Sequence, residues 1–359
     1  MALPSDAAPG PKAETDTGAR GIDSIDRYRP AVMAELRSAL AGRSGPPYGL
    51  MRYHLGWEDE NGRPIDENGG KLLRPALCLL CCEAVGGKPE RVLPAAASIE
   101  LIHNFSLIHD DLEDRSELRH GRATLWRRWG DAQAINTGDG MFALAHATLL
   151  RLTELGHPSE RVLEAVRMLD EATLRLCEGQ HRDLLYEGER GTSIADYMEM
   201  IEGKSAVLIA AGCGMGALLG GADDAAVHGL YEFGRRMGLA FQVRDDVLGI
   251  WGDSAVTGKP AGDDLRAGKN SYPVVAGFER ASAEQRKRLE ELLASDTPGD
   301  AEVARGCRLL EELGAREESE RMALEQAERA VTYLGDLPLE EEFRRDLEQL
   351  ARFAATRSA

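Results

Sequence analysis

The sequence lacks an apolar run of membrane-spanning length and lacks an excess of basic residues. No stretch approaches ~18 uncharged apolar residues, so we expect no transmembrane segment. The N-terminus lacks the charged-then-apolar pattern of a signal peptide. The formal net charge is −18, and no basic patch is evident, which argues against nucleic acid as a partner. An anionic substrate would have to be bound through local cations.

Cysteine and aromatic residues are also scarce. Cys78 and Cys81 lie inside a helical run, and no second pair completes four zinc ligands. We interpret all six cysteines as small buried residues of a reducing, cytoplasmic protein. Aromatic residues make up only 5% of the chain, whereas Ala, Leu, Glu and Arg dominate, which favours helices over sheets.

The chain divides into a short extension and one helical domain. Residues 1–22 show no periodicity and are expected to be disordered. Residues 23–359 contain no linker and no alternating stretch long enough for a strand, so we expect a single all-α domain. The Ala- and Gly-dense segment 208–221 is expected to be a central packed helix. The expected long helices span 74–86, 92–114, 131–154, 159–188, 193–220, 225–250, 270–281, 283–295, 299–333 and 339–356.

Residues 99–119 concentrate the acidic side chains. At helical spacing, one stripe of this segment holds four polar residues, His103, Ser106, Asp110 and Asp114. Asp111 lies beside the stripe, near a helix end where the macrodipole disfavours negative charge. A bound cation would relieve this repulsion, and oxygen ligands without cysteine favour Mg²⁺. Considered alone, the stretch fits a solvated acidic helix end equally well.

Two further segments add to this pattern. The helical run 241–253 contains the adjacent pair Asp245 and Asp246, so two distant acidic runs could face each other across bound cations. Lys71 and Arg74 lie at the start of a predicted helix, where unpaired N–H groups favour phosphate. His103 could donate to the same phosphate, although a single helical histidine is more often a core residue.

These motifs resemble the trans-isoprenyl diphosphate (polyprenyl) synthases, in particular the farnesyl and geranylgeranyl diphosphate synthases. Six blocks match in order over roughly residues 22–357: GGKLLRP, ELIH…SLIHDDLED, LRHGRATLW, CEGQHRDL, EGKSAVL, and FQVRDDVLG followed by TGKPAGDDLRAGKNSYP. The resemblance implies the isoprenoid synthase fold, a bundle of long helices around a deep central cavity. It also implies a homodimer.

The resemblance further implies a Mg²⁺-dependent condensation of isopentenyl diphosphate with an allylic diphosphate, with three Mg²⁺ ions in each active site. The implied metal ligands are Asp110, Asp111, Asp114, Asp245 and Asp246. The implied ligands of isopentenyl diphosphate are Lys71, Arg74, His103 and His120. The implied contacts of the allylic diphosphate are Arg119, Lys204, Ser205, Gln242, Lys259 and Lys269, of which Lys204 also assists ionisation to an allylic cation.

Three positions depart from the family pattern. Gly249 replaces the last aspartate of the second acidic block, and we expect Asp253, one turn later, to compensate. His120 replaces the second arginine of a usual Arg-Arg pair, so a fixed charge on the isopentenyl side becomes a titratable one. Ala123 stands where proline is usual, which loosens a turn.

Product length in this family depends on the residue five positions before the first aspartate. Here that residue is Phe105, and Ile102 lies three positions earlier. A bulky ring at this position blocks long chains. We therefore expect a C15 to C20 product, geranylgeranyl diphosphate in particular.

Two other functions are considered. A class I terpene cyclase or lyase would ionise the same substrate without isopentenyl diphosphate; His120 and Gly249 favour it, whereas the retained Lys71, Arg74 and His103 do not. A non-catalytic regulatory subunit would be expected to lose aspartates that this chain keeps. Residues 350–359 are expected to be a frayed helix end rather than a lid over the site.

Overall fold

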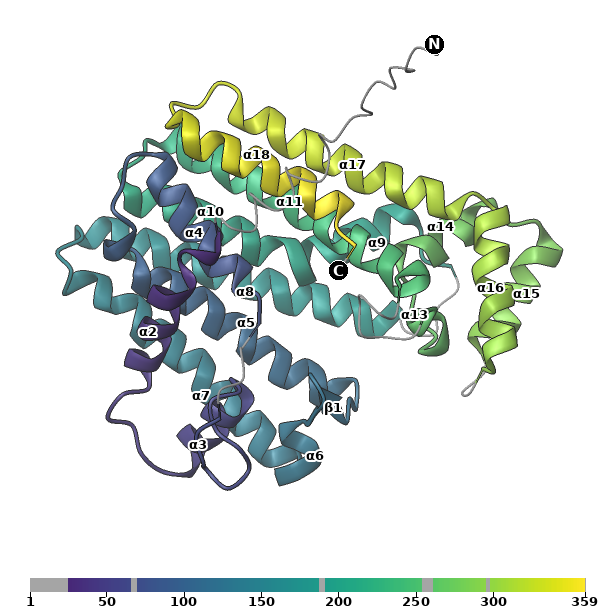
Figure 1. The fold of residues 1–359 in the computed structure, drawn as a ribbon, viewed down its shortest axis with the longest axis horizontal. Helices are drawn as coiled ribbons and strands as arrows, with labels where there is room; N and C mark the ends of the chain where they lie inside the picture. Colours follow the sequence, from purple (N-terminus) through teal and green to yellow (C-terminus); the bar gives the residue numbers. More distant parts are fainter. Residues whose placement is uncertain (1–24, 66–69, 187–190, 254–260, 295–297, 359) are drawn as a thin grey trace, which may run out of the picture.

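A computed structural model of the chain describes residues 25–65, 70–186, 191–253, 261–294 and 298–358. The expected disordered extension and Lys259 lie outside these residues. Long helices build almost all of the described structure (Figure 1). They are α2 (Arg29–Ala39), α3 (Pro46–His54), α4 (Leu73–Ala84), α5 (Leu93–Glu113), α6 (Leu125–Trp129), α7 (Asp131–Leu149), α8 (Ser159–Tyr186), α9 (Ile194–Ile201), α10 (Val207–Gly220), α11 (Asp224–Trp251), α13 (Asp263–Arg266), α14 (Tyr272–Arg280), α15 (Ala283–Leu293), α16 (Asp300–Glu312), α17 (Ala315–Leu334) and α18 (Glu341–Thr356). The expected all-α fold is confirmed.

Most predicted helices agree with the structure to within a few residues, but two are divided. The helix predicted over 299–333 is two helices, because the chain turns at Gly314, whose φ of +69° is left-handed. The helix predicted over 193–220 contains a π-helical turn, η3 (Glu202–Ala206), between α9 and α10. Both breaks fall inside continuous helical patterns, which is why the apolar periodicity did not reveal them.

The central helix α10 is apolar on all sides and buried along its length. Its small residues let neighbouring backbones approach: a Cβ at Gly216 would lie 2.0 Å from the carbonyl oxygen of Cys78 on α4. A Cβ at Gly234 of α11 would lie 2.9 Å from the Cα of Ala210. The prediction of a central packed helix is therefore confirmed, and α4, α10 and α11 form the middle of the bundle (Figure 1).

One helical stretch, Ile194–Gly220, is long and apolar enough to cross a membrane by length and composition alone. Its most apolar window is 83% buried inside the protein, where α10 packs between α4 and α11. Core helices of soluble proteins pass the same test, so this stretch is only a weak indication of a membrane span.

A short hairpin follows α5 directly. Its strands β1 (Leu118–Arg119) and β2 (Arg122–Ala123) pair antiparallel, with Arg119 opposite Arg122. The two residues between them, His120 and Gly121, both have positive φ, as the tightest hairpin turns require. The hairpin turns the chain back so that Arg119 lies against the end of α5.

Candidate active site

A cavity of about 870 Å³ lies between α5, α8, α9 and α11. Its volume is within the range of small-molecule sites, about 300–1,000 Å³. Carboxylates and cations from segments far apart in sequence converge on it. The charged side chains that line it are Asp110, Asp114, Asp183, Asp245, Asp246, Asp264, Lys71, Lys204, Lys269 and Arg357.

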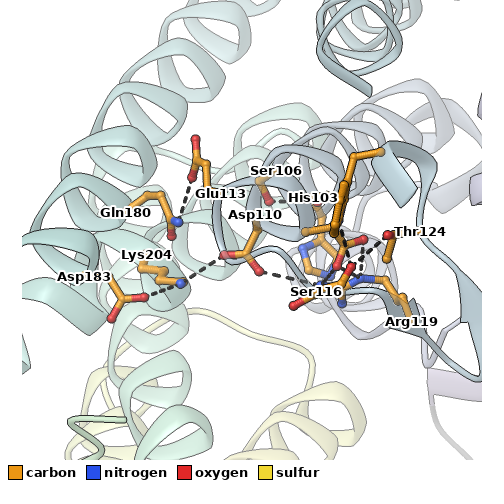
Figure 2. A network of polar contacts seen from close by, with 12 residues as sticks. His103, Ser106, Asp110, Glu113, Ser116, Arg119, Thr124, Gln180, Asp183 and Lys204 are labelled. Carbon is orange, nitrogen blue, oxygen red and sulfur yellow. Dashed lines mark hydrogen bonds and ion pairs between the residues drawn. The ribbon is translucent and has the colours of Figure 1, made fainter. Parts of the chain in front are cut away.

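On the α5 side, Asp110 is bridged to α8 by a lysine. Lys204 Nζ lies 3.1 Å from Asp110 Oδ1 and also pairs with Asp183 of α8 (Figure 2). Burial alone would lower the pKa of Lys204, but the two carboxylates raise it above its ordinary value. Lys204 is therefore a fixed positive charge between two helices. Beside it, Gln180 Nε2 donates to Glu113 Oε2 at 2.8 Å.

Asp111 faces away from the cavity and holds Arg119. Arg119 Nε donates to both carboxylate oxygens of Asp111, at 2.9 and 3.0 Å. Asp111 is only 3% exposed, and burial raises its pKa although Arg119 lowers it. Successive helical residues point about 100° apart, so Asp110 can face the cavity while Asp111 faces the hairpin. In this structure Asp111, which was expected to be a metal ligand, therefore holds the side chain of Arg119. Arg119 was expected to contact the allylic diphosphate.

Asp114 is the C-cap residue of α5 and lines the cavity. Burial and the neighbouring Asp110 raise its pKa to about 6, although Lys204 and Lys269 act in the opposite direction. The surroundings of Asp114 therefore disfavour the charged form of its carboxylate. A bound cation would relieve that cost.

On the α11 side, Asp246 is buried and held mainly by neutral donors. It accepts from the Tyr197 hydroxyl, from Tyr272 N–H at 2.8 Å, and from Gln242 Nε2 at 3.1 Å. Ser205 Oγ donates to Gln242 Oε1 at 2.7 Å, which fixes the amide. Burial and the charge of nearby Asp264 raise the pKa of Asp246 to about 7.

Asp245, the other member of the pair, is exposed to the cavity and pairs with Arg357. The expectation of a frayed C-terminal end is wrong, because α18 continues to Thr356 and Arg357 is only 5% exposed. The Arg357 guanidinium stacks 3.9 Å from the centroid of the Phe241 ring, and Arg244 Nε donates to its carbonyl oxygen at 2.7 Å. The alternative, that Arg357 of this segment lies near the site, agrees with the structure.

The residues expected to hold isopentenyl diphosphate are divided between two environments. Lys71 lines the cavity, near Asp245 and Arg357. Arg74 and His103 form a partly buried pair, with Arg74 Nη1 3.2 Å from His103 Nε2, and neither is among the described residues lining the cavity. Burial, Arg74 and Arg119 lower the pKa of His103 well below its ordinary value, so the imidazole is neutral at pH 7. His120 is exposed at the hairpin turn.

Phe105 and Ile102, the expected determinants of product length, lie on α5 away from the charged cavity. Ile102 is fully buried. The Phe105 ring packs edge-on against His109 and against Phe142 of α7, with centroid distances of 5.0 and 5.4 Å. Their effect on product length stays a prediction.

The sequence analysis gave no site role to two acidic residues that line the cavity, Asp183 and Asp264. Asp183 and Asp264 lie in the matched blocks CEGQHRDL and GDDLRAGK, so a signal for them existed. Neither belongs to an adjacent acidic pair on a long helix, which is the pattern that drew attention to the other aspartates.

The donor chemistry of the cavity fits Mg²⁺ bound together with phosphate. Within the described part of the chain, no three His, Cys, Asp or Glu side chains converge closely enough to hold an ion by themselves. Mg²⁺ is usually held by one or two carboxylates, with substrate phosphates and waters completing the octahedron. Asp110 and Asp114 on one wall and Asp245 on the other offer such oxygens.

Comparisons with known proteins identify the family of the chain. The polyprenyl synthetase family model matches residues 59–310. The (2E,6E)-farnesyl diphosphate synthase of Mycobacterium tuberculosis is 39% identical over 313 residues, which cover 86% of each chain. The geranylgeranyl diphosphate synthase of the same organism is 38% identical over 315 residues, covering 87% of this chain and 88% of the relative. A crystal structure of a polyprenyl synthetase from Streptomyces coelicolor A3(2) superposes with a TM-score of 0.86 at 39% identity, covering 93% of this chain and 99% of that one.

Proposed function

The chain belongs to the polyprenyl synthetase family and is a trans-prenyltransferase that makes short-chain isoprenyl diphosphates, and we propose that it makes a C15 to C20 product, geranylgeranyl diphosphate in particular. It does so by condensing isopentenyl diphosphate with an allylic diphosphate. One observation carries the proposal: carboxylates from two distant helices and four cations line a single cavity. Phe105 on α5 favours the short product.

The allylic diphosphate lies between the two acidic walls. When bound, Mg²⁺ supplies positive charge that polarises the leaving diphosphate; Asp110, Asp114 and Asp245 would hold it. Lys204 and Lys269 stabilise the negative charge that grows as the carbon–oxygen bond breaks. Asp111 and Asp246 act indirectly: Asp111 orients Arg119, and Asp246 orients Gln242. Lys259 remains part of the proposed set on the resemblance alone.

Isopentenyl diphosphate binds through Lys71, next to the allylic diphosphate. Arg74 and His103 lie on the same side and support this binding. Its double bond attacks the allylic cation to form the new carbon–carbon bond. A proton then leaves to the released diphosphate. The helical walls exclude water, which would otherwise capture the cation.

We propose that a second copy of the chain covers an apolar face on α7 and α8. Soluble monomers rarely expose large contiguous apolar patches. The exposed apolar side chains of this face are Ile135, Phe142, Leu163, Leu174 and Leu185. A dimer by light scattering that becomes a monomer when Leu163 and Leu174 are both changed to Glu would support this arrangement; a wild-type monomer would contradict it.

The function is tested with purified protein, Mg²⁺ and isopentenyl diphosphate, supplied with C5, C10, C15 or C20 allylic diphosphate in separate reactions. Dephosphorylated alcohols and extractable hydrocarbons are then resolved by mass spectrometry. C15 or C20 alcohols that appear only with isopentenyl diphosphate support the proposal. A hydrocarbon formed without isopentenyl diphosphate would instead identify a cyclase, the alternative that His120 favours.

Phe105→Ala tests the product length in the same assay. We expect products longer than C20, because a bulky ring at this position would no longer block a longer chain. Leu324→Ala, a loss of apolar volume at an exposed position of α17, is the control and should leave product length unchanged. An unchanged product in Phe105→Ala would remove Phe105 as the determinant.

A further inference from the structure

The first residue of the π-helical turn η3 is held from two sides by arginines. The Glu202 carboxylate lies 3.0 Å from Arg175 Nη2 of α8 and 2.6 Å from Arg235 Nη1 of α11. The side chains of Glu202 and Arg235 are only 21% and 18% exposed, so salt and water screen this contact weakly. Arg235 also pairs with Glu232 at 2.7 Å, which keeps its guanidinium in place. Glu202 is therefore fixed between two helices.

The wide turn of the backbone also begins at Glu202. Val207 N–H donates to the Glu202 carbonyl oxygen five residues earlier, in place of the four-residue spacing of an α-helix. The next residue, Gly203, packs its backbone against α8: an added Cβ would lie 2.7 Å from the carbonyl oxygen of Arg175 and 3.1 Å from the Cα of Gly179. A side-chain rotation cannot relieve contacts with backbone atoms, so η3 and α8 are tightly packed here.

One stripe of α8 meets η3, because Arg175, Gly179 and Asp183 are spaced four residues apart. At one end of the stripe, Arg175 pairs with Glu202. At the other end, Asp183 pairs with Lys204 (Figure 2). A shift that moved Asp183 toward Glu202 would bring like charges together. The stripe therefore favours a single position of η3 along α8.

Glu202 and Lys204 project from opposite sides of the same turn. Side chains two positions apart on a helix point about 200° apart at α-helical spacing. Accordingly, Glu202 contacts the two arginines, whereas Lys204 and its neighbour Ser205 line the cavity. A rotation of η3 that released Glu202 would therefore also turn Lys204 away from its present direction.

We propose that Glu202 is a positioning residue for diphosphate binding: by holding η3 between Arg175 and Arg235, it sets the direction in which Lys204 projects into the cavity. This inference deepens the proposed function and rests on it in one respect, that Lys204 meets a diphosphate. Repulsion alone would make the loss of a nearby negative charge strengthen the binding of an anion. Loss of the positioning contact weakens it, so the two effects have opposite signs.

The experiment measures the binding of inorganic pyrophosphate at saturating Mg²⁺ by isothermal titration calorimetry. Lys204→Met should weaken binding about thirtyfold, because a charged donor is lost. Glu202→Gln, which keeps the size of the side chain but removes its charge, should weaken binding about fivefold. The double variant should bind within about twofold of Lys204→Met alone, because Glu202 acts through Lys204.

Glu199→Gln is the matched control. It removes the same charge three residues earlier, where Glu199 pairs with Arg182 outside the described cavity lining, and should bind pyrophosphate within about twofold of the wild type. Glu202→Asp keeps the charge and should bind more tightly than Glu202→Gln. If Glu202→Gln does not fold by circular dichroism, Arg175→Gln removes one half of the contact and takes its place in the same double-variant comparison with Lys204→Met.

Three results would overturn the inference. The first is unchanged or tighter pyrophosphate binding in Glu202→Gln. The second is a double variant that is weaker than Lys204→Met by the full loss seen in Glu202→Gln, because Glu202 would then act independently of the lysine. The third is unchanged binding in Lys204→Met.

Pyrophosphate binding requires no prenyl transfer, which separates this inference from the proposed function. A protein that elongates nothing, but in which the losses at Glu202 and Lys204 do not add, would support the role of Glu202 and refute the condensation. A protein that elongates normally, but in which the two losses add in full, would do the reverse.

Discussion

On α5, Asp110 and Asp111 each face a cation from another element, whereas on α11 the buried Asp246 is held mainly by neutral donors. Lys204 and Arg119 balance the first wall. A tyrosine hydroxyl, a backbone N–H and a glutamine amide hold Asp246. The exception on the second wall is Asp245, which pairs with Arg357 from the end of the chain.

The difference indicates different tasks for the two walls. Of these two cations Lys204 lines the cavity, so the proposed substrate could take the place of its carboxylate partners with phosphate oxygens. The neutral donors around Asp246 hold its buried carboxyl group in one orientation. They thereby fix the geometry of the α11 wall.

The largest effect is expected from Asp110→Ala, which removes a carboxylate from the α5 wall. We expect the rate of isopentenyl incorporation to fall about a thousandfold or more, because electrostatic stabilisation of the leaving group is lost. A radiolabelled incorporation assay with single-substrate controls measures it. Asp131→Ala, which removes an exposed aspartate paired with Arg115 near the same hairpin, should stay within about twofold of the wild type. Activity retained in Asp110→Ala would exclude the α5 wall from the chemistry.

Lys204→Met removes the cation that bridges α5 and α8 while preserving most of the side-chain volume. We expect kcat to fall about a hundredfold, comparable to the loss of one preorganised donor to a developing negative charge. Steady-state kinetics at saturating Mg²⁺ give the value. The matched variant Arg182→Met removes a cation of α8 that pairs with Glu199, outside the described cavity lining, and should have little effect. Equal losses in both variants would mean that Lys204 acts only on stability.

Arg357→Gln tests the cation that pairs with Asp245 on the α11 wall. With the guanidinium absent, Mg²⁺ no longer competes with it for Asp245, so half-maximal activity should need about three- to tenfold less Mg²⁺. A titration of rate against free Mg²⁺ measures the shift. Arg352→Gln, on the exposed side of the same helix where the residue pairs with Glu328, is the control. A higher Mg²⁺ requirement would show that Arg357 assists metal binding rather than opposing it.

The smallest expected effect is on how the stability of the protein depends on pH, through Asp246 on the α11 wall. The pKa of Asp246 is raised to about 7, above the value of about 3.9 expected in the unfolded chain. The folded state therefore holds more protons than the unfolded state between those values, and stability falls as pH rises from about 4 to 7. Asp246→Asn removes this contribution, so its melting temperature relative to the wild type should rise by about 2 °C between pH 5 and 8.

Differential scanning calorimetry without metal gives these melting temperatures. Asp139→Asn, an exposed aspartate on α7, should show no such trend. A pH-independent difference between the wild type and Asp246→Asn would mean that Asp246 titrates at its ordinary pKa.

The sequence predicted the helices well because apolar periodicity is a local property. It also identified both acidic runs, since Asp110 and Asp114 recur at helical spacing. It did not separate the carboxylates that line the cavity from Asp111, because that division depends on the hairpin that brings Arg119 to α5. Arg357 could be named only as an alternative to a frayed helix end, because its place beside Asp245 depends on the packing of α18 along the bundle.

The π-helical turn η3 makes the site sensitive to chain length as well as to residue type. A Cβ at Gly179 would lie 2.2 Å from the backbone nitrogen of Lys204, so η3 is pressed against α8. Deleting a single residue from η3 would restore ordinary helical spacing, because a π-helical turn holds one residue more than an α-helical turn. The wide turn that presents Lys204 and Ser205 to the cavity would then be lost. A one-residue deletion in an apparently uninterrupted helix would thus disturb this wall of the cavity even if it left every charged residue in the chain.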